Sequence, residues 1–290
     1  MNGLIWGLIS SFGYGTADFI ARFTSRAIGA TVVVFGVFLT GSILLTAYIL
    51  FSGPGFNFSA NNIWLLPLAG VANMFMLVFL FEALARGPIA VAAPIVSSHP
   101  GLVLIMLAFL GVIPSLLEIV GLVIIISGVI FLSKQTSHIT ANLKMDHAYI
   151  NKTILIASAA SVAYAIQVIA AQEAAIEFGP FQAAWATRTF GLIAIVILLL
   201  CQKKRIVIPI RWWPIVIVQG CLDVGAVLAL ILGSLGQDRI IVVVLSSTFS
   251  VVTVLLARVF IKEPVSRNQW LAIFIIVIGV AIISSESYSH

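Results

Sequence analysis

Apolar residues lie in long continuous runs along the chain, and short polar connections separate the runs. A helix that crosses the hydrocarbon core of a bilayer needs about 20 largely apolar residues, with a working range of about 17–25. Strands of membrane barrels are only about 9–11 residues long and alternate in polarity. The pattern therefore predicts an all-α integral membrane protein with ten transmembrane helices, at 3–21, 30–51, 63–85, 88–110, 115–133, 152–172, 181–201, 212–234, 239–260 and 268–285.

Composition agrees with this class. The chain is 61% hydrophobic and 9% charged, whereas soluble domains are about 45–50% apolar and about 25% charged. Its mean hydropathy is +1.19. These values exclude a soluble enzyme, a nucleic-acid-binding protein and a disordered chain. The longest polar stretch, 134–152, is expected to be a loop, and its histidines, His138 and His147, are too isolated to form a metal site.

Matching residues recur along the chain at a fixed offset, which indicates an internal duplication. At an offset of 150 the matches are Tyr14 with Tyr164, Gly29 with Gly179, Gly70 with Gly220, Ser97 with Ser247, Pro114 with Pro264, and Asn73 with the near-isosteric Asp223. We expect two five-helix repeats, 1–133 and 152–290, joined by a connecting loop at 134–151. Because five is an odd number, the second repeat must enter the membrane inverted, as in many secondary transporters.

The basic residues of the connections are distributed unevenly. The connections after the first, third, fifth, seventh and ninth runs hold all of them but Arg239: Arg22, Arg26, Arg86, Lys134, Lys144, Lys152, Lys203, Lys204, Arg205, Arg211, Lys262 and Arg267. Lysine and arginine are enriched in cytoplasmic loops of membrane proteins. The charge bias therefore predicts that both termini lie outside, in a protein of the plasma (inner) membrane.

Polar side chains inside the first run are candidate site residues. A charge at the bilayer centre costs about 2.5–3.5 kcal/mol on insertion scales, so each one requires a reason. Tyr14 and Asp18 lie on one helical face that continues to Arg22. Asp18 either pairs locally with Arg22 or is a cavity carboxylate that binds substrate or a coupling proton. Tyr164 and Gln167 form a similar but neutral stripe in 152–172.

A second group of candidates lies in the later runs. Trp185 and Arg188 belong to 181–201, and Asp223 belongs to the next run at a compatible depth. Consecutive helices joined by short loops are usually neighbours, so we expect an Arg188–Asp223 ion pair. This pair is either structural or a bridge that opens when an anionic or zwitterionic substrate competes for the arginine. Asn73, the counterpart of Asp223, is also a candidate.

His99 is the remaining candidate, since it stands between Pro94 and Pro100 in the fourth run. Prolines remove backbone hydrogen bonds, which a membrane helix tolerates where neighbours or cavity water satisfy the freed carbonyls. His99 is therefore either a proton relay or substrate ligand, or a hydrogen-bonding group toward a neighbouring helix.

Several short motifs resemble EamA-type members of the drug/metabolite transporter superfamily. In the second half they are the segment 245–257, Glu263-Pro264, Gln269 and Gly279. The corresponding motifs in the first half are Gly87-Pro88, Pro94, Ser97, Pro100, Glu118, Gly121 and Gly128, together with Gly15-Thr16-Ala17-Asp18-Phe19. In the second half, Gly220-Cys221-Leu222-Asp223 also resembles a motif found in one branch of the family. The resemblance implies ten helices in two inverted repeats. It also implies a central cavity lined mainly by 3–21, 63–85, 88–110, 152–172, 212–234 and 239–260. Members of the family are usually drawn with cytoplasmic termini, which is opposite to the charge-based orientation.

The function expected from these features is a secondary transporter that exports or exchanges a small, amino-acid-like metabolite by alternating access. The expected partners are a small-molecule substrate, with or without a coupled proton, and the lipid bilayer, with no nucleic acid and no cofactor. No GxxxxGK[ST] phosphate loop occurs. The alternatives are a membrane-embedded enzyme and a small-molecule channel. An enzyme would need clustered carboxylates or a nucleophile–base set, whereas Asp18, Glu82 and Asp223 are scattered singly.

Overall fold

The computed structural model describes residues 3–52, 62–111, 113–142, 147–203, 207–234, 242, 245–246 and 248–286. Its described elements are helices: α1 (Gly3–Ile28), α2 (Ala30–Ser52), α3 (Leu65–Arg86), α4 (Ile89–Ser97), α5 (His99–Phe109), α6 (Leu116–Asn142), α7 (His147–Phe178), α8 (Pro180–Cys201), η1 (Ile210–Trp212), α9 (Trp213–Ser234), α11 (Phe249–Phe260) and α12 (Arg267–Glu286). Helix therefore occurs in the described part of each of the ten apolar runs.

Six helices in the described ranges are long and apolar enough to cross a membrane: Ala30–Phe51, Leu65–Arg86, Ile89–Phe109, Ala148–Phe178, Pro180–Cys201 and Ile210–Gly233. Three shorter apolar helices, Leu116–Leu132, Phe249–Phe260 and Arg267–Ile283, accompany them. Large apolar side chains such as Leu50, Val123 and Ile197 are exposed on the outer faces of their helices. Apolar outer faces of this kind are typical of helices that meet lipid.

The connection expected at 134–151 is mostly helical, so the expected loop is wrong. Helix α6 continues to Asn142 and α7 begins at His147. Only 143–146 lies outside the described residues within this stretch. No proline or glycine interrupts 134–142, and so a change from apolar to polar residues does not require the helix to end. Polarity here marks the end of the apolar span, not the end of the helix.

The fourth run is broken at Ser98, between α4 and α5. Pro100 has no N–H to donate to the carbonyl of Val96, four residues earlier. His99 Nδ1 lies 3.2 Å from that carbonyl oxygen, and the Ser98 hydroxyl donates to the carbonyl of Ile95 at 2.6 Å. Local side chains thus satisfy carbonyls that a continuous helix would have paired with backbone N–H groups.

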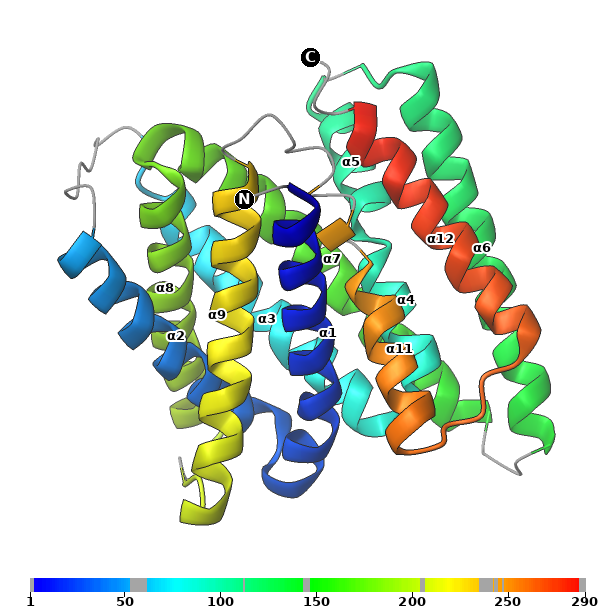
Figure 1. Cartoon of the computed structure of the whole chain (residues 1–290), viewed down its shortest axis with the longest axis horizontal. Helices are drawn as coiled ribbons and strands as arrows, with labels where there is room; N and C mark the ends of the chain where they lie inside the picture. The colour runs from blue at the N-terminus through cyan, green and yellow to red at the C-terminus, as the bar shows by residue number, and fades with distance from the viewer. Residues whose placement is uncertain are drawn as a thin grey trace.

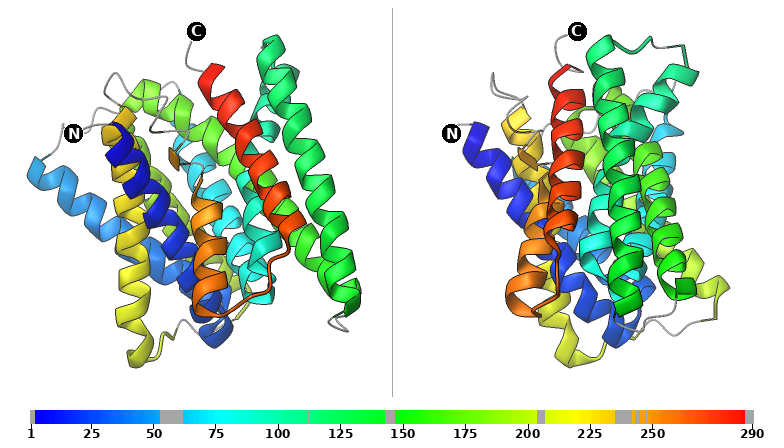
Figure 2. Two further views of the ribbon diagram at one scale, coloured as in Figure 1. Left: turned by 45° about the vertical axis from the view of Figure 1, so that its right-hand side comes forward. Right: turned by 90° about the vertical axis from the view of Figure 1, so that its right-hand side faces the viewer.

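The helices pack mainly across the two halves of the chain. Helix α1 packs against α9 and α11, while α7, its counterpart in the second half, packs against α3 and α4. Helices α6 and α12 form a pair of their own, which lies at one side of the molecule in the left view of Figure 2 and faces the viewer in the right view. Helix α1 begins and α12 ends at the same end of the bundle (Figure 1). We call this end of the bundle the terminal end. We call the opposite end, which carries the basic connections between helices, the basic end.

Local conformations recur at the offset seen in the sequence. Gly29 and Gly179 both have positive φ, +89° and +93°, and each stands between two consecutive helices. Ser98 and Thr248 share nearly identical φ and ψ, and each hydroxyl donates to the carbonyl three residues earlier at 2.6 Å. The fourth and ninth runs therefore have the same interruption at the same place.

A further pair of matching features begins α6 and α12. Ser115 and Glu118 form a capping box, in which the backbone N–H of each residue donates to the side chain of the other, at 2.8 and 3.2 Å. Ser266 and Gln269 form the same box, at 3.0 and 3.1 Å. Capping boxes satisfy N–H groups that the first helical turn leaves free. The two halves thus start their last helices by the same device.

Candidate functional site

A cavity of about 280 Å³ lies between the two halves of the bundle. It is lined by side chains from α1, α3, α7, α8 and α9, together with Phe249 at the start of α11. The polar members of its lining are Tyr14, Asp18, Asn73, Tyr164, Gln167, Gln172, Thr187, Arg188 and Asp223. The remaining lining is apolar, so a few polar groups converge in an otherwise hydrophobic site, as is usual for small-molecule pockets.

Three of these polar residues form one buried chain. Arg188 Nη2 lies 2.8 Å from Asp223 Oδ2, and Arg188 Nη1 donates to Asn73 Oδ1 at 3.1 Å. Arg188, Asp223 and Asn73 are 5%, 6% and 4% exposed. The expected Arg188–Asp223 ion pair is therefore present. Its guanidinium joins α3, α8 and α9, and so both halves of the chain contribute to it.

Arg188 reaches its partners by crossing α2. Helices α8 and α9 scarcely touch each other, and α2 packs against both, so the two helices are not the close neighbours that the sequence suggested. A Cβ atom at Gly41 of α2 would lie 3.5 Å from Arg188 Cδ, and the guanidinium lies 5.8 Å from the centroid of the Phe38 ring. The bare backbone at Gly41 therefore leaves room for the arginine stem to pass.

Asp18 lines the same cavity without a partner of its own. Asp18 is 6% exposed. Within the described part of the chain, no hydrogen bond or ion pair reaches its carboxylate. The local Asp18–Arg22 pair considered from the sequence is not formed, because Arg22 Nη1 donates instead to Glu263 Oε2 at 3.2 Å. Asp18 thus presents an unpaired carboxylate to the cavity.

Aromatic side chains share this cavity with Asp18. Tyr14 and Tyr164 line the same cavity as Asp18. The ring of Tyr14 meets Phe249 edge to face, with 6.2 Å between ring centroids. Tyr164 stacks on His99, with centroids 3.7 Å apart and planes inclined by 19°. Asp18 therefore shares its cavity with the aromatic rings of Tyr14, Tyr164 and Phe249.

His99 and Trp185 do not belong to the cavity lining. His99 supports Tyr164 from behind and bonds the Val96 carbonyl of its own broken helix. Trp185 Nε1 donates to Thr46 Oγ1 at 2.8 Å and so joins α8 to α2. The structure brings together the other seven candidates, Tyr14, Asp18, Asn73, Tyr164, Gln167, Arg188 and Asp223, around one cavity.

The sequence missed Gln172 and Thr187, which also line the cavity. The signal for Gln172 was present, since it is a polar residue in an apolar run, eight positions after Tyr164 on the same helical face. The family resemblance implied that 88–110 lines the cavity and left 181–201 out. In the described residues the reverse holds, because α8 contributes lining residues and α4 and α5 contribute none. In the same ranges, no group of three or more His, Cys, Asp or Glu side chains could hold a metal ion.

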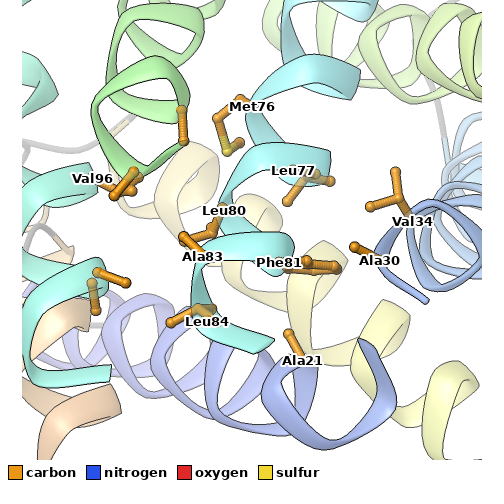
Figure 3. Packing of buried hydrophobic residues seen from close by; sticks show 14 of the residues in the cluster. Ala21, Ala30, Val34, Met76, Leu77, Leu80, Phe81, Ala83, Leu84 and Val96 are labelled. Atoms are coloured by element: carbon orange, nitrogen blue, oxygen red, sulfur yellow. The ribbon is translucent and has the colours of Figure 1, made fainter. Parts of the chain in front are cut away.

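The cavity extends toward the terminal end of the bundle. Its lining includes Pro180, the first residue of α8, and Ala175 in the last turn of α7. Leu80 lies at the opposite limit, and the next turn of α3 brings Phe81, Ala83 and Leu84, all at most 2% exposed. In Figure 3, Phe81 points toward Ala21 of α1 and Ala30 of α2, whereas Ala83 and Leu84 lie on the other side of α3. The floor of the cavity is therefore filled by core residues.

An ion pair ties the helices together at the basic end, beyond this floor. Glu263, which follows α11, accepts from Arg22 of α1 and, through Oε1, from the backbone N–H of Ala90 at 3.0 Å. Ala90 lies in the first turn of α4, where free N–H groups favour an anion. Gly87 leaves room for the pair, since a Cβ there would lie 2.6 Å from Arg22 Nη1. One carboxylate thus joins α1, α4 and the segment after α11.

Comparison with known proteins agrees with this architecture. The model of the EamA-like transporter family matches residues 1–134 and again residues 151–285. A solved structure described as "Crystal structure of protein" is similar in fold, with a TM-score of 0.65 and 20% identity over 97% of this chain and 95% of the other. No curated protein matches the sequence. The apolar helices together with the family match make the chain an integral, multi-pass membrane protein. With the family model covering nearly all of its length in two matches, the chain belongs to the EamA-like transporter family.

Proposed function

We propose that the chain is a secondary transporter that moves a small metabolite across the membrane by alternating access. One observation carries the proposal: a cavity with buried charges lies between the two halves, reaches the terminal end, and is blocked toward the basic end. Secondary transporters hold their substrate in such a site at the interface of two repeats. A cavity of about 280 Å³ lies near the lower limit of small-molecule sites, about 300–1,000 Å³, and suits a metabolite.

The proposal includes ten transmembrane helices in two inverted five-helix repeats, 1–133 and 152–290, joined by 134–151. Support comes from the two family matches, whose limits fall at 134 and 151. The recurring glycines, the recurring breaks at Ser98 and Thr248, and the two capping boxes add to it. Cross-packing of α1 with α9 and α11, and of α7 with α3 and α4, is what an exchange of equivalent repeats would produce.

Alternating access requires the cavity to close at one end and open at the other. In this structure the basic end is held by Glu263 with Arg22 and Ala90. Breaking these contacts would let α1 separate from α4 and α11. The breaks at Ser98 and Thr248 lie next to these helices, and interrupted helices are a common feature of transporter sites. Asp18, as an unpaired carboxylate, is the group best placed to bind substrate or a coupled proton.

The proposed orientation puts the basic end in the cytoplasm and both termini outside. Support comes from the basic residues, which gather in connections at one end of the bundle. The plasma (inner) membrane is the proposed location. In this orientation the cavity faces outward, and the Arg22–Glu263 pair closes the cytoplasmic side.

Counterflow tests the proposed function against its alternatives. Lipid vesicles that contain the purified protein are preloaded with unlabelled leucine, phenylalanine, isopentylamine and phenethylamine. Labelled forms of the four are then supplied outside, one at a time, with protein-free vesicles as the control. A carrier gives saturable, transient accumulation of at least one label. A channel gives equilibration without accumulation, and an enzyme gives a chemically altered label; either result would contradict the proposal.

A further inference from the structure

We propose that the cavity binds small organic cations, such as protonated amines that carry no carboxylate, and that Asp18 is their counter-charge. The inference deepens the proposed transport function. Its claim about binding stands by itself, and only the claim that the bound cation is also transported rests on that function. It depends on which charges of the cavity are already paired and which are free.

The one arginine among the lining residues is already occupied. Arg188 Nη2 forms an ion pair with Asp223 at 2.8 Å, and Arg188 Nη1 donates a hydrogen bond to Asn73 at 3.1 Å. Phe38 lies beside the guanidinium, and the residue is 5% exposed. A substrate carboxylate would have to displace Asp223. That aspartate would then be buried without its partner, which is strongly unfavourable. Among the residues that the structure describes, the cavity therefore offers no free cation to an anionic or zwitterionic substrate.

Asp18 gives the cavity an excess of negative charge. In the described part of the lining the ionisable carboxylates are Asp18 and Asp223, and Arg188 neutralises only the second. Burying an unpaired carboxylate is unfavourable unless a cation or a proton accompanies it. A ligand with one ammonium group would supply that charge. An amino acid would bring its own carboxylate as well and place it in a site that already contains two.

The surroundings of Asp18 suit an ammonium group. Tyr14, Tyr164 and Phe249 line the same cavity, and the face of an aromatic ring attracts a cation that lies within about 6 Å of the ring centroid. One face of Tyr164 is covered by His99, which fixes the ring where it borders the cavity. Gln167 and Gln172 add neutral oxygens that accept hydrogen bonds from N–H groups. The aliphatic lining of α3 and α9 would then contact the apolar part of the ligand.

Matched ligands test the charge class directly. Three sets share a carbon skeleton and differ in charged groups: isopentylamine, leucine and 4-methylvalerate; phenethylamine, phenylalanine and 3-phenylpropionate; and tyramine, tyrosine and 3-(4-hydroxyphenyl)propionate. Apparent affinities are measured by thermal shift of the purified full-length protein, because a ligand that binds the folded state stabilises it. We expect at least one amine to bind about tenfold or more tightly than its matched amino acid and acid.

A variant pair then tests Asp18 itself. Asp18→Asn should lower the apparent affinity for the tightest-binding amine by about tenfold or more. Glu82→Gln removes a carboxylate from α3 outside the cavity lining, and it should change that affinity by about twofold or less. The inference is overturned if an amino acid or acid binds as tightly as its amine, if no amine binds, or if Asp18→Asn binds amines normally. The comparison of ligands on the unmodified protein stands even if the variant does not fold.

Failure of this inference can be told apart from failure of the proposed function. Counterflow of leucine or phenylalanine but not of amines would keep the transporter and reject the cation class. Binding of amines that depends on Asp18, without counterflow of any probe, would keep the site and reject transport.

Discussion

Arg188 and Asp223 form a 2.8 Å ion pair in the interior of a membrane protein, although their helices, α8 and α9, hardly contact each other. The arginine passes over Gly41 of α2 to reach both Asp223 and Asn73. At the offset of 150, Arg188 corresponds to Phe38 and Asp223 corresponds to Asn73. A Cβ at Gly191, the counterpart of Gly41, would in turn meet the Phe38 ring at 2.8 Å. In each half of the chain, therefore, a glycine makes room for the side chain at the position equivalent to Arg188.

Removing one partner of this pair should destabilise the protein more than removing both. Arg188→Leu leaves Asp223 buried and unpaired, and Asp223→Leu does the same to Arg188, at about 3–5 kcal/mol each, whereas replacement of both can be nearly neutral. Thermal denaturation in detergent should therefore show a double variant more stable than the sum of the single losses predicts. Simple additivity would show that the two residues do not interact. If the double variant is stable but does not transport, the pair takes part in binding or gating.

Much of this site could be predicted from the polar residues within the apolar runs, because charged and amide side chains are rare there. Asp18, Arg188 and Asp223 stand out in the sequence for that reason, and all three line the cavity. Pattern did not reveal their partners. Helical spacing shows only neighbours on the same helix, and so it suggested Arg22 for Asp18, while Arg22 in fact pairs with Glu263, 241 residues away. The role of Asn73 in holding Arg188 is invisible for the same reason.

Helix limits were predictable only where polarity and helix end coincide. The run 30–51 is matched by α2 because glycine and short polar segments flank it. Helices α6 and α7 continue through polar residues that contain no helix breaker, and this extension carries no hydrophobic signal. At Ser98 the sequence signal was partial, since the prolines around it indicated lost backbone hydrogen bonds but not a complete break into α4 and α5.

Gly41 should tolerate no branched side chain. A Cβ there would lie 3.1 Å from Val224 Cγ2 and 3.5 Å from Arg188 Cδ, so Gly41→Val must displace the arginine stem or α9. We expect a loss of about 1–3 kcal/mol, as for other overpacked interiors, together with a several-fold loss of counterflow. Gly225→Val is the matched control, because no atom lies within 4 Å of a Cβ at that helical position. Equal behaviour of the two variants in both measurements would show that Gly41 has no part in placing Arg188.

Membrane orientation can be read from the accessibility of single cysteines. In a background in which Cys201 and Cys221 are replaced by serine, Asn62→Cys and Glu177→Cys should react with an impermeant thiol reagent added to intact cells. Asn151→Cys and Gln202→Cys should react only after permeabilisation. All four positions are uncharged or lie outside the basic connections, and so the charge bias that predicts the orientation is preserved. The reverse pattern would place the termini in the cytoplasm, as family members are usually drawn.

Weakening the contact at the basic end should shift the protein toward a state that opens there. Glu263→Gln keeps the shape of the side chain but removes the charge that holds Arg22 at 3.2 Å and accepts from Ala90 at 3.0 Å. A mutation shifts the equilibrium between two states only if it changes their free energies by different amounts. Loss of a contact that is made in one state alone therefore favours the other state. A cysteine at Leu80, the deepest lining position on α3, reports the change in sealed vesicles of known orientation. Without the Glu263 change, Leu80→Cys should react only with reagent at the terminal end.

In the Glu263→Gln background, reaction from the basic end should rise several-fold, and reaction from the terminal end should fall in proportion. Glu82→Gln is the matched control, since it removes a carboxylate from α3 without touching Arg22 or Ala90. Arg22→Gln should reproduce the effect of Glu263→Gln, because it breaks the same pair from the other side. If both variants keep the original labelling pattern while folding normally, the pair is part of a fixed floor. Access from the basic end would then have to arise by separation of the core residues Phe81, Ala83 and Leu84 alone.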